Sequence, residues 1–321
     1  MSIIGHLNSS SEGGNATEEE KKPSPDKISQ TANGISIKDF FDLSKPWVLV
    51  PDGSFSGFFN FIPATYRQGP WSPVATIAII VIISFLSGGI LSFLNGDFLQ
   101  YFQEDQHGHE YVAFTQEWYM ALLCFSWTAF LCWHILNYSA VGAGAWVTFT
   151  VWSWTCIVVR SGLAVMAPFV PGARLPMDML RFPTMLSASL TFFLWNFVLF
   201  PIILVFIKDP EKKKKFIGYM TNFRLTQLHV CNIFIASYVT IYVGPRRQLH
   251  TGDAVAAATM VVIYVLVYYL ILDRIGVHLY PIFSPRTPAV VISYALFFAM
   301  CHGGFQGWQK VLEVCYKEPI Q

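Results

Sequence analysis

Three polar side chains recur at a regular spacing within one long apolar run. Thr226, His229 and Asn232 stand at i, i+3 and i+6 near the start of the run 226–243. On an α-helix this spacing places the three side chains on one face. A histidine there can exchange a proton, and a hydroxyl or an amide can hydrogen-bond a substrate or a neighbouring helix. The stripe therefore indicates an internal polar site, or the hydrogen bonding that fixes helix packing.

Other polar residues also lie inside apolar runs, where they are costly and therefore mark candidate sites. Arg160 lies deep in one run and needs an acceptor, whereas Glu117 lies at the end of another and can reach water. The remaining members are Tyr264, Tyr268, Asp273, Tyr294 and His302. For all of them the alternative role is again hydrogen bonding between helices.

The histidines and cysteines lack the spacing of a metal site. The histidines that could meet near the ends of the runs form no HxxH or HExxH pair; they are His134, His229, His250, His278 and His302. Five of the six cysteines lie inside the runs, and no CxxC pair occurs. We therefore expect no metal, no cofactor and no disulfide framework.

These polar residues are carried by apolar runs of membrane-spanning length. A spanning helix needs about 20 mostly apolar residues. The chain has seven such runs, at 74–94, 112–136, 143–170, 184–207, 226–243, 254–272 and 288–306. Charged residues make up only 13% of the chain, against about 25% in soluble domains. The sequence predicts an all-α fold, a polytopic transmembrane helical bundle of about seven spans.

The runs divide the chain into three regions. Residues 1–72 form a polar, largely disordered tail, with a Phe-rich segment expected either on the membrane surface or packed under the bundle. Residues 73–308 form the transmembrane domain, and residues 309–321 form a short C-terminal tail.

The loop charges predict an orientation. Loop 208–225 carries five lysines and Arg224, whereas loop 95–111 carries four acidic residues and no Lys or Arg. The positive-inside rule puts the lysine loop in the cytoplasm, and with seven spans the N-terminal tail as well. Arg246 and Arg247 then lie outside, against the rule. The net charge of +1 gives no reason to expect nucleic acid. The expected partners are membrane lipids and other membrane-protein subunits. The endomembrane system or the plasma membrane is the favoured location, and an organellar membrane is the alternative.

A sequence pattern extends over 227–288. It has a His early in one span, a Pro-x-x-x-Leu-His exit, a Tyr in the next span and an Asp-Arg-x-Gly…Tyr-Pro-Ile ending. The matching residues are His229, Pro245, Leu249, His250, Tyr264, Asp273, Arg274, Gly276, Tyr280 and Pro281. In these residues the chain resembles the rolling stone proteins and the related androgen-induced membrane protein family. The resemblance implies six family-like spans, with 74–94 as an extra N-terminal helix.

The resemblance also implies candidate catalytic residues. Some androgen-induced members hydrolyse fatty acid esters of hydroxy fatty acids with a Thr nucleophile and a His. Thr150, four residues after Trp146, matches the family Thr, and Thr115 in AFTQEW is the alternative. Asn232 occupies the position of the family's catalytic His, and His229 could substitute from one turn away.

Three functions follow from these residues. The first is a non-catalytic rolling stone-like protein, in membrane organisation or as a subunit of a membrane complex. The second is a lipid ester hydrolase that uses Thr150, His229 and Asn232, with Thr115 as the alternative nucleophile. The third is a small transporter or receptor. Because Asn cannot act as a general base at neutral pH, Asn232 favours the first function over the second.

Overall fold

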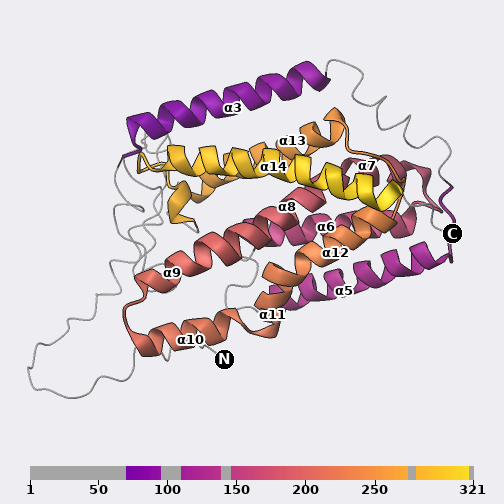
Figure 1. Cartoon of the computed structure of the whole chain (residues 1–321), viewed down its shortest axis with the longest axis horizontal. Coiled ribbons are helices and arrows are strands. Elements are labelled where there is room, and N and C mark those ends of the chain that lie inside the picture. Colours follow the sequence, from indigo (N-terminus) through magenta and orange to yellow (C-terminus); the bar gives the residue numbers. More distant parts are fainter. Residues whose placement is uncertain (1–69, 95–109, 139–145, 274–279, 318–321) are drawn as a thin grey trace, which may run out of the picture. The chain divides into compact units, whose positions relative to one another are not determined.

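The computed structural model describes residues 70–94, 110–138, 146–273 and 280–317 (Figure 1). These residues form helices and the connections between them, and no strand occurs in the described ranges. Within these ranges, seven helices are long and apolar enough to cross a bilayer. The prediction of an all-α, multi-pass membrane protein is confirmed. The expectations for the tail fall on residues 1–69, outside the described residues.

Four of the spans are single, uninterrupted α-helices. They are α3 (Pro73–Leu94), α5 (Gln116–Tyr138), α6 (Phe149–Met166) and α14 (Val290–Lys317). Two others contain a π-helical segment, which has one more residue in each hydrogen-bonded turn than an α-helix. The fifth span joins α11 (Phe223–Thr226), η7 (Gln227–Cys231) and α12 (Asn232–Tyr242), and the sixth joins α13 (Thr251–Val267) and η8 (Tyr268–Leu272).

The fourth span begins well before the predicted run. It extends over Pro171–Val205. Its segments are η5 (Pro171–Ala173), α7 (Arg174–Met179), α8 (Arg181–Phe193), the π segment η6 (Leu194–Leu199) and α9 (Phe200–Phe206). The predicted run begins at residue 184 because Asp178 and Arg181 interrupt the apolar sequence, yet both side chains are buried.

The last helix also exceeds its prediction. α14 continues to Lys317, past residue 308, where the sequence predicts that the C-terminal tail begins. Its final turns are held by Tyr316, whose hydroxyl donates to Ile241 O at 3.2 Å. The lysine loop likewise contains a helix, α10 (Pro210–Met220), which Asp209 caps by accepting from Glu211 N and Lys212 N. Phe216 of α10 stacks on Phe200 of α9, with ring centroids 6.0 Å apart.

The chain divides into two compact units. The larger comprises residues 77–266 and 291–321, and in it α6 packs against α5, α7, α8 and α12. A core cluster here includes Leu131, Val151, Trp154, Ala188 and Leu228. Trp154 is completely buried, and its indole donates to Thr128 O at 3.0 Å.

The smaller unit comprises residues 1–76 and 267–290. Asp273 Oδ2 accepts from Trp71 Nε1 at 2.7 Å and pairs with Arg286 Nη2 at 3.0 Å. Tyr268 and Tyr269 donate to the carbonyls of Tyr280 and Phe283. Asp273 and Tyr280, both part of the resemblance pattern, therefore fix the turn that contains η9 (Pro281–Phe283).

Candidate functional site

His229 lies where two π-helical segments meet. It belongs to η7, and its ring stacks on Trp195 of η6, with centroids 4.2 Å apart. Asn196, the next residue of η6, donates from Nδ2 to His229 O at 3.0 Å. The side chain is 7% exposed, and His229 Nδ1 has no hydrogen-bond partner among the described residues. A π segment leaves some backbone carbonyls without their usual α-helical hydrogen bond. The carbonyl of His229 can therefore accept from Asn196.

Asn232 joins the same helix to α8. Its side chain is fully buried; Nδ2 donates to Ala188 O at 3.4 Å, and Oδ1 accepts from Ile233 N at 2.7 Å. Asn232 and His229 therefore both point into the bundle, as the polar stripe indicates, although the π turn interrupts the regular α-helical spacing. Both ends of the Asn232 amide are engaged in hydrogen bonds.

Thr150 lies at the same end of the bundle as His229. It is in the first turn of α6, and the adjacent Val151 shares a core cluster with Leu228, the neighbour of His229. Within the described residues, no hydrogen bond joins the Thr150 hydroxyl to His229 or Asn232.

Thr115 lies at the opposite end. It is exposed and caps α5, since its hydroxyl accepts from Trp118 N at 3.2 Å. Trp118 Nε1 reaches Val165 O, near the end of α6. Val165 is 15 residues beyond Thr150, a rise of about 22 Å along an α-helix. Of the two candidate nucleophiles, Thr150 is the one on the His229 end.

Of the remaining predicted polar residues, Tyr264 lies beside the start of α6, where its ring also contacts Phe149 and Trp152. Tyr264 donates to Val147 O at 3.0 Å, and Tyr294 is buried, whereas His302 is exposed on α14. His278 lies outside the described residues. In the described ranges, no group of three or more His, Cys, Asp or Glu side chains is arranged as a metal site requires.

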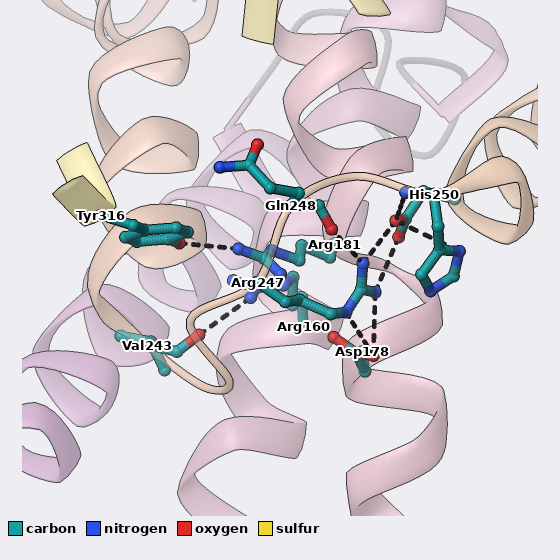
Figure 2. A network of polar contacts seen from close by, with 9 residues as sticks. Arg160, Asp178, Arg181, Val243, Arg247, Gln248, His250 and Tyr316 are labelled. Atoms are coloured by element: carbon teal, nitrogen blue, oxygen red, sulfur yellow. Dashed lines mark hydrogen bonds and ion pairs between the residues drawn. The ribbon is translucent and has the colours of Figure 1, made fainter. Parts of the chain in front are cut away.

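A second polar group occupies the other end of the larger unit (Figure 2). We call it the arginine cluster; it comprises Arg160 of α6, Asp178 of α7, Arg181 of α8, Arg247 of the α12–α13 connection and Asp253 of α13. Four of these side chains are 1% exposed or less, and that of Arg247 is 10% exposed. Buried charges are stable only when they are paired and hydrogen-bonded.

Arg247 binds both carboxylates of the cluster. Its Nη1 lies 2.6 Å from Asp253 Oδ2, and its Nη2 lies 2.9 Å from Asp178 Oδ2 and 2.9 Å from Asp253 Oδ1. Asp253 Oδ2 also accepts from His250 N at 2.9 Å, which caps the start of α13. Two carboxylates therefore surround the Arg247 charge, which explains how this largely buried guanidinium is accommodated.

Arg160 and Glu117 meet at one peptide group. Arg160 Nη2 donates to Val243 O at 3.0 Å, and Gly244 N donates to Glu117 Oε1 at 2.7 Å. Gly244 has φ +100°, a left-handed conformation that favours glycine. The turn at the end of α12 thus gives one hydrogen-bond partner to each of the two charged side chains that the sequence singles out in spans two and three.

Arg181 and Tyr111 complete the surroundings of the cluster. Arg181 Nη2 donates to Tyr316 Oη at 2.7 Å. Tyr111 precedes α5 and has the Arg174 guanidinium 4.9 Å from its ring centroid. Burial, and then the Asp178 charge, raise the pKa of Tyr111 to about 12. Its phenol therefore stays neutral at physiological pH.

Sequence reasoning identifies only part of this cluster. It singles out Arg160 because that residue lies deep in a run, but it treats Arg247 only as a loop charge. Asp178, Arg181 and Asp253 lie just outside the ends of the apolar runs, where charges usually face water. One sequence feature could have indicated the cluster. The ends of spans three and five and the starts of spans four and six each carry an ionisable residue within one or two turns.

Comparisons with known proteins add no relative. No family model, no curated protein and no solved structure matches the chain. The resemblance to the rolling stone and androgen-induced proteins therefore stays a prediction from the residues that carry it.

Proposed function

We propose that this multi-pass membrane protein is non-catalytic and works as a rolling stone-like protein, in membrane organisation or as a subunit of a membrane complex. One observation carries the proposal. At the position where the resembling hydrolases keep their catalytic His, the Asn232 amide is held between Ala188 O and Ile233 N. An amide in this arrangement cannot take a proton from a hydroxyl, and its contacts are those of a residue that joins two helices.

The surroundings of His229 support the same proposal. Its ring lies flat against Trp195, and its backbone carbonyl accepts from Asn196. These contacts join the fifth span to the fourth. They lie near the end of the two spans that the lysine helix α10 connects. Stable contacts between spans are what a protein needs to present a defined surface to lipids or to partner subunits.

A Thr-dependent lipid ester hydrolase is the alternative, and two observations favour it. His229 Nδ1 has no hydrogen-bond partner in the described part of the chain, so this nitrogen is available as a base. Thr150 begins α6 at the same end of the bundle. Activation of a Thr hydroxyl requires a base within hydrogen-bond reach, and the described contacts do not join the two residues.

Labelling with a fluorophosphonate probe distinguishes the two functions. The full-length protein in detergent is incubated with a fluorescent long-chain fluorophosphonate, and Thr150→Ala and Thr155→Ala serve as test and control variants. We expect wild type to remain unlabelled, because no hydrogen bond in the described part of the chain joins a Thr hydroxyl to His229. Labelling of wild type and of Thr155→Ala, but not of Thr150→Ala, would contradict the proposal and establish the hydrolase.

A further inference from the structure

Two buried arginines of the arginine cluster have hydrogen-bond donors to spare. Arg160 and Arg181 are each 1% exposed. Each makes one side-chain hydrogen bond, to Val243 O and to Tyr316 Oη. Among the described residues, the Nε and Nη1 atoms of both side chains have no partner. A guanidinium carries five N–H donors and is always charged, so most of the donor capacity of these two groups faces no acceptor.

Arg160 and Arg181 are the two guanidinium groups of the cluster without a carboxylate partner in the described ranges. Asp178 and Asp253, the two carboxylates of the cluster, both pair with Arg247. An anion between Arg160 and Arg181 would give their buried charges the partner that no described side chain supplies.

We propose that Arg160 and Arg181 bind an oxyanion, of the phosphate or carboxylate type, through their free Nε and Nη1 donors. The edge of a guanidinium that carries Nε and a terminal nitrogen matches the two oxygens of an oxyanion, and such charge-assisted bonds are strong. Figure 2 shows the Arg160 and Arg181 side chains close together, between Tyr316 and Arg247. Asp178 Oδ1 also has no partner in the described residues. Its negative charge repels an anion, but it can accept a hydrogen bond from a hydroxyl group on that anion.

The site lies near one end of the bundle. Arg160 is six residues before the end of α6 at Met166, a depth of about 9 Å. Arg247 and His250, at 10% and 21% exposure, are the parts of the network that reach the surface. The anion therefore has two sources: a soluble ion from the adjoining water, or the headgroup of an anionic lipid whose chains stay in the bilayer.

Thermal unfolding of the full-length protein in a neutral detergent tests the proposal. Sodium phosphate is titrated against sodium chloride at equal ionic strength, and phosphatidylglycerol against phosphatidylcholine in mixed micelles. A ligand that binds only the folded state raises the melting temperature with its concentration. We expect a saturable rise of several degrees with phosphate or phosphatidylglycerol, and none with chloride or phosphatidylcholine. A response to phosphate identifies a soluble ion, and a response to phosphatidylglycerol alone identifies a lipid headgroup.

Variants assign the effect to the cluster. Arg160→Gln removes an uncompensated buried charge, so its melting temperature without anion should equal or exceed that of wild type, and the anion response should vanish. Arg181→Lys keeps the charge but loses the planar donor edge, and its half-maximal anion concentration should rise about tenfold or more. The matched control is Arg246→Gln, an exposed neighbour of Arg247, which should respond as wild type does.

Two results would overturn the proposal. One is a wild-type protein that responds to neither phosphate nor phosphatidylglycerol. The other is an Arg160→Gln or Arg181→Lys protein that keeps the wild-type response. If both variants fail to fold, the wild-type titrations still decide, because they require no substitution.

Discussion

Arg247 and Asp253 form a two-point ion pair, with Nη1 2.6 Å from Oδ2 and Nη2 2.9 Å from Oδ1. The same guanidinium reaches Asp178, so removal of Arg247 would leave two buried carboxylates without their cation. We expect Arg247→Leu to destabilise the protein by about 3–5 kcal/mol, the usual cost of breaking a buried pair. Thermal unfolding in detergent measures this loss. Exposed Arg246→Leu is the control, and equal stability of the two variants would contradict this role of Arg247.

Gly244 is the second sensitive position. Its φ of +100° is strained for any residue with a side chain, and an added Cβ would lie 3.1 Å from Met177 Cε. We expect Gly244→Ala to cost about 1–3 kcal/mol, because the turn delivers the acceptor of Arg160 and the donor to Glu117. Gly218→Ala is the control, since Gly218 lies within helix α10 with open space around its Cβ position. It should be neutral or stabilising, and a Gly244→Ala protein as stable as this control would show that the turn tolerates a side chain.

Asn232 should contribute modestly to helix packing. Asn232→Leu removes the interhelical bond to Ala188 O, and bonds of this kind inside membranes contribute about 0.6–2 kcal/mol. The variant should insert and purify normally but unfold at a lower temperature. Ser237→Ala removes a bond within α12 only and should have a smaller effect. A variant of Asn232 that fails to insert would indicate a larger role than packing.

The lysine helix and the arginine cluster should lie on opposite sides of the membrane. Loop 207–222 follows the fourth span, and residues 243–250 follow the fifth. In intact cells, a membrane-impermeant maleimide should label Arg246→Cys but not Lys214→Cys if the lysines are cytoplasmic. The N-terminal tail contains two glycosylation sequons, at Asn8 and Asn15, and a cytoplasmic tail should leave both without glycans. The reverse labelling pattern, or glycans in the tail, would invert the orientation.

The sequence predicts the spans well where apolar length alone determines them. The runs 74–94, 112–136 and 226–243 agree with their helices to within a few residues. The prediction for the fourth span begins too late in the chain, because Asp178 and Arg181 are residue types that usually lie in loops. Their burial depends on Arg247 and Tyr316, which lie 69 and 135 residues away along the chain, and no local pattern contains that pairing.

The candidate site follows the same rule. The stripe of His229 and Asn232 correctly indicates burial, since a polar residue in a span turns inward. The partners Trp195, Asn196 and Ala188 could not be predicted, because they depend on how the fourth and fifth spans align. The arginine cluster brings together three stretches that are distant in the sequence, at 160, 178–181 and 247–253, and the sequence singles out only Arg160 within it.

Ester turnover by the purified protein tests the central claim, that the His229 and Asn232 end of the bundle is built for packing and not for catalysis. The full-length protein in lipid nanodiscs is incubated with a fatty acid ester of a hydroxy fatty acid, and released acid is measured by mass spectrometry. Thr150→Ala is the matched inactive control. We predict that wild type and Thr150→Ala release acid at the same background rate. Release by wild type well above that of Thr150→Ala would contradict the account and make Thr150 a nucleophile.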